Sequence, residues 1–158
     1  TISKIMSTIS EPAVAALLIG KSARASELNV RFVLEKGSAY SKSDYPIPTE
    51  TLITVIGNLI DNAFDAMNEA NGDYDKPKEL LLGIYSKQGS LLITANDTGV
   101  GIKPENMEKV FQNGYSTKGE GRGTGMYQVK RMVENLGGEI TIESQFGTGT
   151  TVTVSLGK

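Results

Sequence analysis

Four short polar side chains recur at helical spacing in the middle of the chain: Asn58, Asp61, Asn62 and Asp65. Residues three and four positions apart share one face of an α-helix, and an apolar stripe occupies the opposite face of this segment. Amide and carboxylate oxygens are hard donors that suit Mg²⁺. An ordinary solvated face is an equally good interpretation of this helix alone, although Asn and Asp are poor helix formers, which argues mildly against it.

A second candidate is the stretch from Asp97 to Ile102 (DTGVGI), which directly follows an expected strand. A carboxylate at the end of a strand can accept a hydrogen bond from an exocyclic amine. Gly99 and Gly101 would let a flat base lie close to the backbone, because glycine has no Cβ. An Asp-rich turn explains the same residues. By itself the stretch is therefore only a weak indication of a base-binding site.

The third candidate is rich in glycine and runs from Lys118 to Gly125 (KGEGRGTG), directly before a helical segment. Glycine at every second position exposes several backbone N–H groups, and the start of the helix adds the positive end of its dipole. Lys118 and Arg122 add positive charge. This combination favours a phosphate-binding lid, and a flexible surface loop is the alternative that the composition also permits.

Two other nucleotide-binding motifs fail on inspection. The segment Gly20-Lys21-Ser22 resembles the end of a P-loop, but the required first glycine would stand where the chain has Ala15. We therefore expect Lys21 to lie on an ordinary helix surface. A dinucleotide-binding Gly-x-Gly-x-x-Gly also fails, because Pro104 or Met126 occupies the position of its third glycine.

The composition excludes several classes of function. The 158 residues include no histidine and no cysteine, which removes imidazole and thiolate metal sites, Cys nucleophiles and the Ser-His-Asp triad. The net charge of −2 comes without a basic tail, so no nucleic-acid partner is expected. The longest apolar run, residues 13–19, is far shorter than the roughly 20 residues that span a bilayer, so the fragment itself is not expected to be membrane-embedded.

Hydrophobic periodicity predicts the elements that must position these residues. A short helical segment ends near Ile9, and Pro12 begins a second helix that runs to about Leu28. The other expected helices cover 49–71, about 105–111 and 124–136, and the expected strands cover 29–35, 79–85, 90–95, 139–144 and 150–156. This order predicts an α+β fold, a two-layer α/β sandwich with helices on one face of a mixed, mostly antiparallel sheet.

Taken in order, the motifs resemble the Bergerat ATP-binding fold that gyrase, MutL, Hsp90 and histidine kinases share. The resemblance covers residues 27–158 and includes the Asn-rich helix, Asp-x-Gly-x-Gly, the glycine lid and a final Gly-x-Gly-Thr at 147–150. Phe111 and the stretch 115–118 (YSTK) resemble the F box of the kinases, although Tyr115 replaces its usual second Phe.

The Asn-rich helix most resembles the Asn box of histidine kinases. Asn58 stands where gyrase-type ATPases carry the glutamate that activates water. An amide cannot act as that base, so the resemblance favours phosphoryl transfer to an external nucleophile over hydrolysis.

The resemblance implies a site for ATP and Mg²⁺. Asn62 is expected to hold the metal ion, Asp97 to accept a hydrogen bond from the adenine amino group, and Thr150 to contact the ring. The expected catalytic residues, which assist the phosphates, are Asn58, Lys118 and Arg122. The residues expected to bind ATP are Asn58, Asn62, Asp65, Asp97, Gly99, Gly101, Ile102, Phe111, Thr117, Lys118, Gly121, Arg122, Gly123, Thr124, Gly125, Met126 and Thr150.

The chain is accordingly identified as similar to the catalytic domain of bacterial two-component sensor histidine kinases, and to the citrate, fumarate and malate sensor kinases among them. The helix around residues 10–25 and the short lid resemble those of this subgroup. Thr124 and Met126 depart from the pattern, because they replace common leucines of the glycine box. Such an enzyme transfers the γ-phosphoryl group of ATP to a histidine on an upstream domain. Residues 1–26 are expected to be the end of that dimerisation and histidine-phosphotransfer domain, and residues 27–158 the catalytic domain.

The resemblance implies two partners: the upstream histidine domain, which makes the full-length protein a homodimer, and a cognate response regulator. It also implies a cytoplasmic domain of a protein anchored in the bacterial inner membrane. Two alternatives are a Ser/Thr protein kinase of the anti-sigma-factor type and an interaction module that has lost ATP. The N-terminal helix argues against the first, and the complete set of motifs argues against the second.

Overall fold

The computed structural model describes residues 2–68, 77–111 and 125–157 of the chain. Four α-helices lie in these ranges: α1 (Ile2–Thr8), α2 (Pro12–Glu27), α3 (Thr49–Asn68) and α4 (Gly125–Asn135). The strands are β1 (Arg31–Leu34), β2 (Glu79–Lys87), β3 (Ser90–Asp97), β4 (Glu139–Gln145) and β5 (Gly149–Gly157). A 3₁₀ turn, η2, covers Pro104–Asn106.

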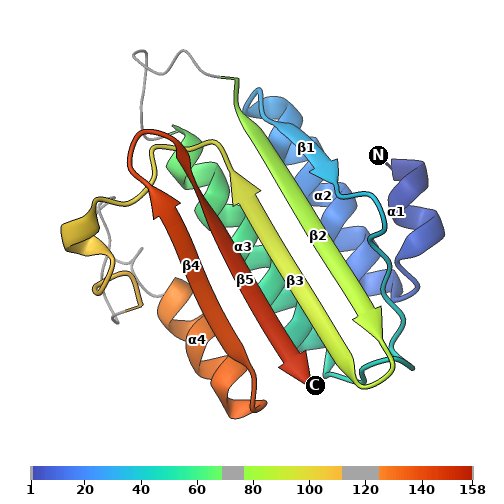
Figure 1. The fold of residues 1–158 in the computed structure, drawn as a ribbon. Coiled ribbons are helices and arrows are strands. Elements are labelled where there is room, and N and C mark those ends of the chain that lie inside the picture. The colour runs from blue at the N-terminus through green and yellow to red at the C-terminus, as the bar shows by residue number, and fades with distance from the viewer. Residues whose placement is uncertain (1, 69–76, 112–124, 158) are drawn as a thin grey trace.

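The five strands form one mixed sheet in the order β1-β2-β3-β5-β4. Only the β1–β2 pair is parallel, and the other three pairs are antiparallel. Figure 1 shows α2, α3 and α4 side by side on a single face of this sheet, with α3 in the middle. The predicted α+β sandwich with helices on one face is therefore confirmed.

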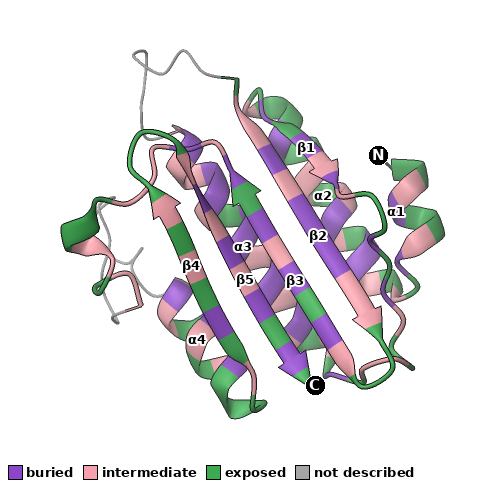
Figure 2. Cartoon of the chain, viewed as in Figure 1, coloured by how far each residue is buried: buried purple, intermediate pink, exposed green. Residues whose placement is uncertain are grey.

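The core lies between the sheet and the helix layer (Figure 2). Period-two alternation turns one apolar set of side chains from each strand toward the helices. Two cross-strand rows of this inner face are wholly apolar: Leu82, Ala95, Val152 and Ile142 form one, and Ile84, Ile93, Val154 and Ile140 form the other. Helix α3 supplies a matching buried stripe, which includes Leu52, Ile56, Leu59, Ala63 and Met67. Each fully buried large apolar side chain contributes roughly 1.5–3 kcal/mol.

The two N-terminal helices share this core. Pro12 occupies the first turn of α2, and the Glu11 side chain accepts a hydrogen bond from the Ala13 amide at 3.5 Å. Ile5 of α1 and Leu18 of α2 are fully buried with the residues of the sheet. No helix among the described residues is long and apolar enough to cross a membrane.

Two segments differ from the sequence-based expectation. The short helix expected at 105–111 is only the 3₁₀ turn η2 followed by turns. The prediction was wrong because a segment of about seven residues is too short to be a stable helix through its own propensity. Strand β3 extends two residues beyond the expected end, to Asp97, because that residue pairs in register with both Leu80 and Thr150.

Candidate functional site

Three polar side chains stand together at one end of the mostly apolar inner face. Asp97 on β3 is in register with Thr150 on β5, and Thr150 is in register with Ser144 on β4. Asp97 and Thr150 are each only 5% exposed, so their polar atoms must find partners within the protein or a ligand. The sheet thus presents a small polar row, with Asp97 and Thr150 buried and Ser144 half-buried, to the helix layer where β3 ends.

The loop that follows β3 is held by Asp97 itself. The Gly99 amide donates a hydrogen bond to Asp97 Oδ1 at 2.8 Å. A Cβ on Gly99 would lie 2.8 Å from the Cβ of Ala66 on α3, so the loop backbone rests directly on that helix. The Val100 amide also donates to the Ala66 carbonyl oxygen at 3.3 Å. Glycine at position 99 is therefore required by the close approach to α3, whereas the approach of a base that the sequence suggested there stays a prediction.

The other side of the loop contacts the turn between β4 and β5. Gly101 adopts a φ of +76°, and a Cβ there would collide with the backbone of Gln145. The Gly147 amide donates to the Val100 carbonyl oxygen at 2.6 Å, and the Ile102 amide donates to Ser144 Oγ at 2.8 Å. The Asp97–Ile102 stretch is thus clamped between α3 and the β4–β5 turn, although these segments are far apart in sequence.

Ser144 was missed by the sequence analysis. Its hydroxyl bonds the Ile102 amide, lies 2.8 Å from Thr150 Oγ1 and donates to the Gly149 carbonyl oxygen at 3.1 Å. A signal was present, since Ser144 replaces the apolar residue that the alternation of Ile140 and Ile142 predicts at this inner-face position.

The polar face of α3 approaches the same end of the molecule. Asn58, Asn62 and Asp65 are all half-buried. Gly125, the first residue of α4, lies close enough that a Cβ there would be 3.4 Å from Asn58 Oδ1. The start of α4, where the helix dipole is positive, therefore stands next to the Asn-rich face, as the phosphate-binding interpretation requires.

Other predicted residues line the margin of this region. Met126 is 6% exposed and belongs to the core, and Phe111 packs against the core while its ring lies 4.9 Å from Lys130 Nζ. The predicted residues Thr117, Lys118, Gly121, Arg122, Gly123 and Thr124 lie outside the described residues.

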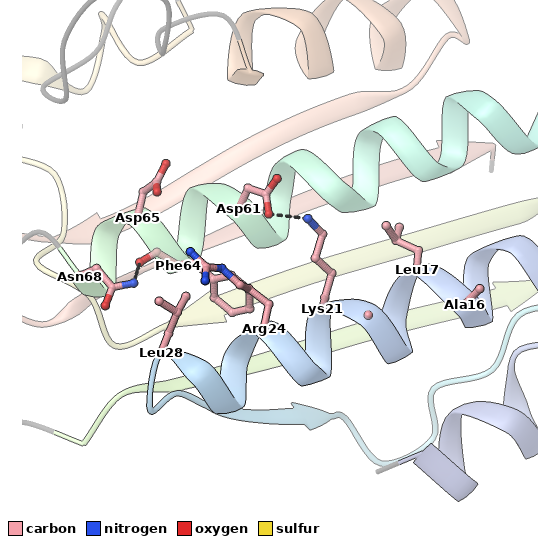
Figure 3. Close-up of a pocket in the computed structure, with 10 residues that line it drawn as sticks. Ala16, Leu17, Lys21, Arg24, Leu28, Asp61, Phe64, Asp65 and Asn68 are labelled. Carbon is pink, nitrogen blue, oxygen red and sulfur yellow. Dashed lines mark hydrogen bonds and ion pairs between the residues drawn. The ribbon is translucent and has the colours of Figure 1, made fainter.

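A hollow between α2 and α3 lies on the other side of the Asn-rich helix (Figure 3). Lys21 projects from α2 and makes an ion pair with Asp61 of α3, with Nζ and Oδ1 2.6 Å apart. Asp65 lines the rim of the same hollow. Lys21 thus lies on a helix surface without the phosphate-binding loop that a P-loop lysine needs, which agrees with the rejection of that motif.

Comparison with known proteins gives a consistent result. The family described as "Histidine kinase-, DNA gyrase B-, and HSP90-like ATPase" matches residues 48–158, more than half of the chain. "Sensor protein CitS" of Bacillus subtilis (strain 168) is 41% identical over 145 residues, 92% of this chain and 26% of that protein. "Sensor histidine kinase DcuS" of Escherichia coli (strain K12) is 38% identical over 146 residues, again 92% and 26%. The chain thus spans about a quarter of the length of these relatives.

Solved structures share the fold. A nucleotide-free catalytic domain of the histidine kinase ThkA superposes with a TM-score of 0.74 at 18% identity and covers 94% of this chain and 92% of that one. Full-length ShkA in complex with AMPPNP superposes with a TM-score of 0.68 at 21% identity over 89% of this chain and 28% of that one.

Proposed function

Because the chain belongs to the family of histidine kinase-, DNA gyrase B- and HSP90-like ATPases, we propose that it is the ATP-binding catalytic domain of a two-component sensor histidine kinase. ATP would bind between the Asn-rich face of α3, the Asp97–Ile102 loop and the start of α4. The observation that carries this proposal is the polar row of Asp97, Thr150 and Ser144, in which Asp97 and Thr150 are buried, at one end of a mostly apolar sheet face.

Asp97 recognises the base in this proposal. Its Oδ1 atom accepts the Gly99 amide, which fixes the plane of the carboxylate. An ionised carboxylate can only accept hydrogen bonds, so it selects a base with an amino group, such as adenine. The apolar row that includes Ala95 and Val152 is the next inner-face row of the sheet and belongs to the buried core.

Asn62 and Asn58 serve the phosphates. A Mg²⁺ ion that travels with nucleotide phosphates needs only one or two oxygen ligands from the protein. No group of three acidic side chains suited to a metal occurs among the described residues, which fits an ion held mainly by phosphate. The half-buried amide of Asn62 would supply one oxygen, and the bound ion would offset phosphate charge. Asn58 of α3 lies beside the first residue of α4, where backbone N–H groups would bind the phosphates.

Lys118 and Arg122 would stabilise the γ-phosphate of bound ATP during its transfer. In the proposed reaction, a histidine nitrogen of the upstream domain forms the new N–P bond as the bond to the β-phosphate oxygen breaks and ADP leaves. The protein contributes positioning and electrostatic stabilisation, which carry most phosphoryl-transfer catalysis. The chain has no histidine of its own, so it would act on a separate domain.

The remaining proposals concern the whole protein. Residues 1–26 would lead from the dimerisation and histidine domain into the catalytic domain, and the full-length protein would be a homodimer. A cognate response regulator would accept the phosphoryl group next. The domain would be cytoplasmic, with its parent protein anchored in the bacterial inner membrane. The names of the relatives, a sensor protein and a sensor histidine kinase, support a role in sensing.

Calorimetric titration of ATP, with and without Mg²⁺, tests the proposal. Asp97→Asn keeps an oxygen for the Gly99 amide but turns an N–H donor toward the adenine amino group, and we expect about a 100-fold loss of affinity. Asn96→Ala, at an exposed position on the outer face, is the matched control and should bind normally. Adding the upstream histidine domain should then yield phosphohistidine on that domain only. Unchanged ATP affinity in Asp97→Asn, or a wild-type chain that binds no ATP, would overturn the proposal.

A further inference from the structure

Ser144 joins three parts of the candidate site that are separate in the sequence. Its single hydroxyl contacts the Ile102 amide of the loop after β3, the Gly149 carbonyl oxygen and the Thr150 hydroxyl of β5. We infer that Ser144 is a positioning residue of the base pocket, and that its hydroxyl decides which way the Thr150 hydroxyl points toward the bound base. This inference rests on the proposed ATP site and names a residue through which that site recognises its base.

The hydrogen-bond inventory of the row supports this role. The Ile102 amide donates to Ser144 Oγ, so that contact uses a lone pair of the serine oxygen. The one hydrogen of Ser144 then goes either to the Gly149 carbonyl oxygen or to Thr150 Oγ1. In the first state Thr150 donates to Ser144 and presents lone pairs to a ligand. In the second state Thr150 accepts from Ser144 and its own hydrogen is available to the ligand.

Adenine presents both kinds of group along one edge, an amino donor and ring-nitrogen acceptors. Asp97 can satisfy only the donor, because a carboxylate has no hydrogen to give. Thr150 pairs in register with Asp97 and is buried beside it, so its hydroxyl is the neighbouring group that can complement a ring nitrogen. Ser144 bears on this choice, because its one hydrogen can go either to the Gly149 carbonyl oxygen or to Thr150 Oγ1.

The location of Ser144 also explains how it holds the pocket together. It stands on β4, in register with Thr150, and so belongs to the last inner-face row of the sheet. Its bond to the Ile102 amide fixes the far end of the loop whose near end is fixed by Asp97 and Gly99. Loss of the hydroxyl would therefore free Thr150 and one end of the loop together.

The test compares ATP with 1-deazaadenosine triphosphate, which keeps the amino group and lacks the ring nitrogen beside it, by calorimetry on the whole chain. Ser144→Ala should weaken ATP about tenfold and should weaken 1-deazaadenosine triphosphate much less, so that the ratio of the two affinities changes. Ser144→Thr keeps a hydroxyl on a β-branched side chain that suits a strand, and it should retain the wild-type ratio. Thr141→Ala, exposed on the outer face of the same strand, is the control.

A double-mutant cycle with Thr150→Val completes the design. If Ser144 acts through Thr150, Ser144→Ala should change ATP affinity less than twofold in the Thr150→Val background. Equal losses for both nucleotides, or full additivity with Thr150→Val, would show a merely structural serine and overturn this inference while the ATP site stands. A wild-type chain that binds neither nucleotide would overturn the proposed function instead.

Discussion

The two sides of α3 carry the same kinds of residue and have different surroundings. On the side facing α2, Asp61 is held in an ion pair with Lys21, and its side chain is still 55% exposed. On the side facing α4, Asn58 lies beside the first residue of that helix, and Ala66 supports the Asp97–Ile102 loop. Neighbouring helices thus divide one polar stripe into a structural part and a part suited to bind a ligand.

The division follows from helix geometry. Each residue rotates the side chain by about 100°, so Asn62 lies between Ala66 and Asn58, whereas Asp61 points toward α2. A surface ion pair such as Lys21–Asp61 contributes little, about 0–1 kcal/mol. Asn62, by contrast, would contact the metal ion of a bound nucleotide. Loss of this metal ligand would have a larger effect on nucleotide affinity. The lesson is that residue type alone does not identify the functional residues of this stripe.

Removing residues 1–26 should give the largest effect, because it takes away α1 and nearly all of α2, which packs against α3. Ile5, Val14 and Leu18 are fully buried. The burial of three such side chains contributes a free energy that approaches the free energy of unfolding of a small domain, about 5–15 kcal/mol. We expect residues 27–158 alone to lose cooperative thermal unfolding, measured by circular dichroism. A variant lacking only residues 1–8 distinguishes the contribution of α1 to stability from that of α2. Cooperative folding and ATP binding by residues 27–158 would instead show that both helices are dispensable.

Asn62→Ala should have the next largest effect, on the side facing α4. Loss of the proposed metal ligand should weaken ATP at least tenfold when Mg²⁺ is present and much less when it is absent, measured by calorimetry. Asp61→Ala is the matched control one residue away and should change ATP affinity less than twofold. Equal effects of the two substitutions would remove the functional distinction between the two sides of α3.

The smallest effect is expected for the ion pair on the α2 side. A double-mutant cycle of Lys21→Met and Asp61→Asn, measured by denaturant unfolding, should give a coupling energy of about 0.2–1 kcal/mol. The coupling should fall further at high salt, because exposed charges are screened. A change of ATP affinity in either single variant would indicate that the α2 side also takes part in binding.

Much of the fold could be predicted from the sequence, because its elements are strongly periodic. The apolar stripe of α3 and the alternation of β5 indicated their own type and boundaries to within a few residues. The segment 105–111 could not be predicted, because its conformation depends on packing rather than on a local pattern. Ser144 was missed for a related reason: the sequence shows it only as a break in the alternation of Ile140 and Ile142, and the cross-strand register with Thr150 gives that break its meaning.

The sequence by itself determined the order of the elements, the glycines that allow close backbone approach and the candidate residues Asn62, Asp97 and Thr150. These are local properties, because periodicity, backbone freedom and donor chemistry are carried by short stretches of chain. Only the tertiary structure decided that Asp97, Thr150 and Ser144 form one polar row, and that Asp61 pairs with Lys21 of α2 while Asn58 lies beside α4. Register and helix packing bring together residues distant in sequence, so the function of a side chain depends on neighbours that its own segment does not contain.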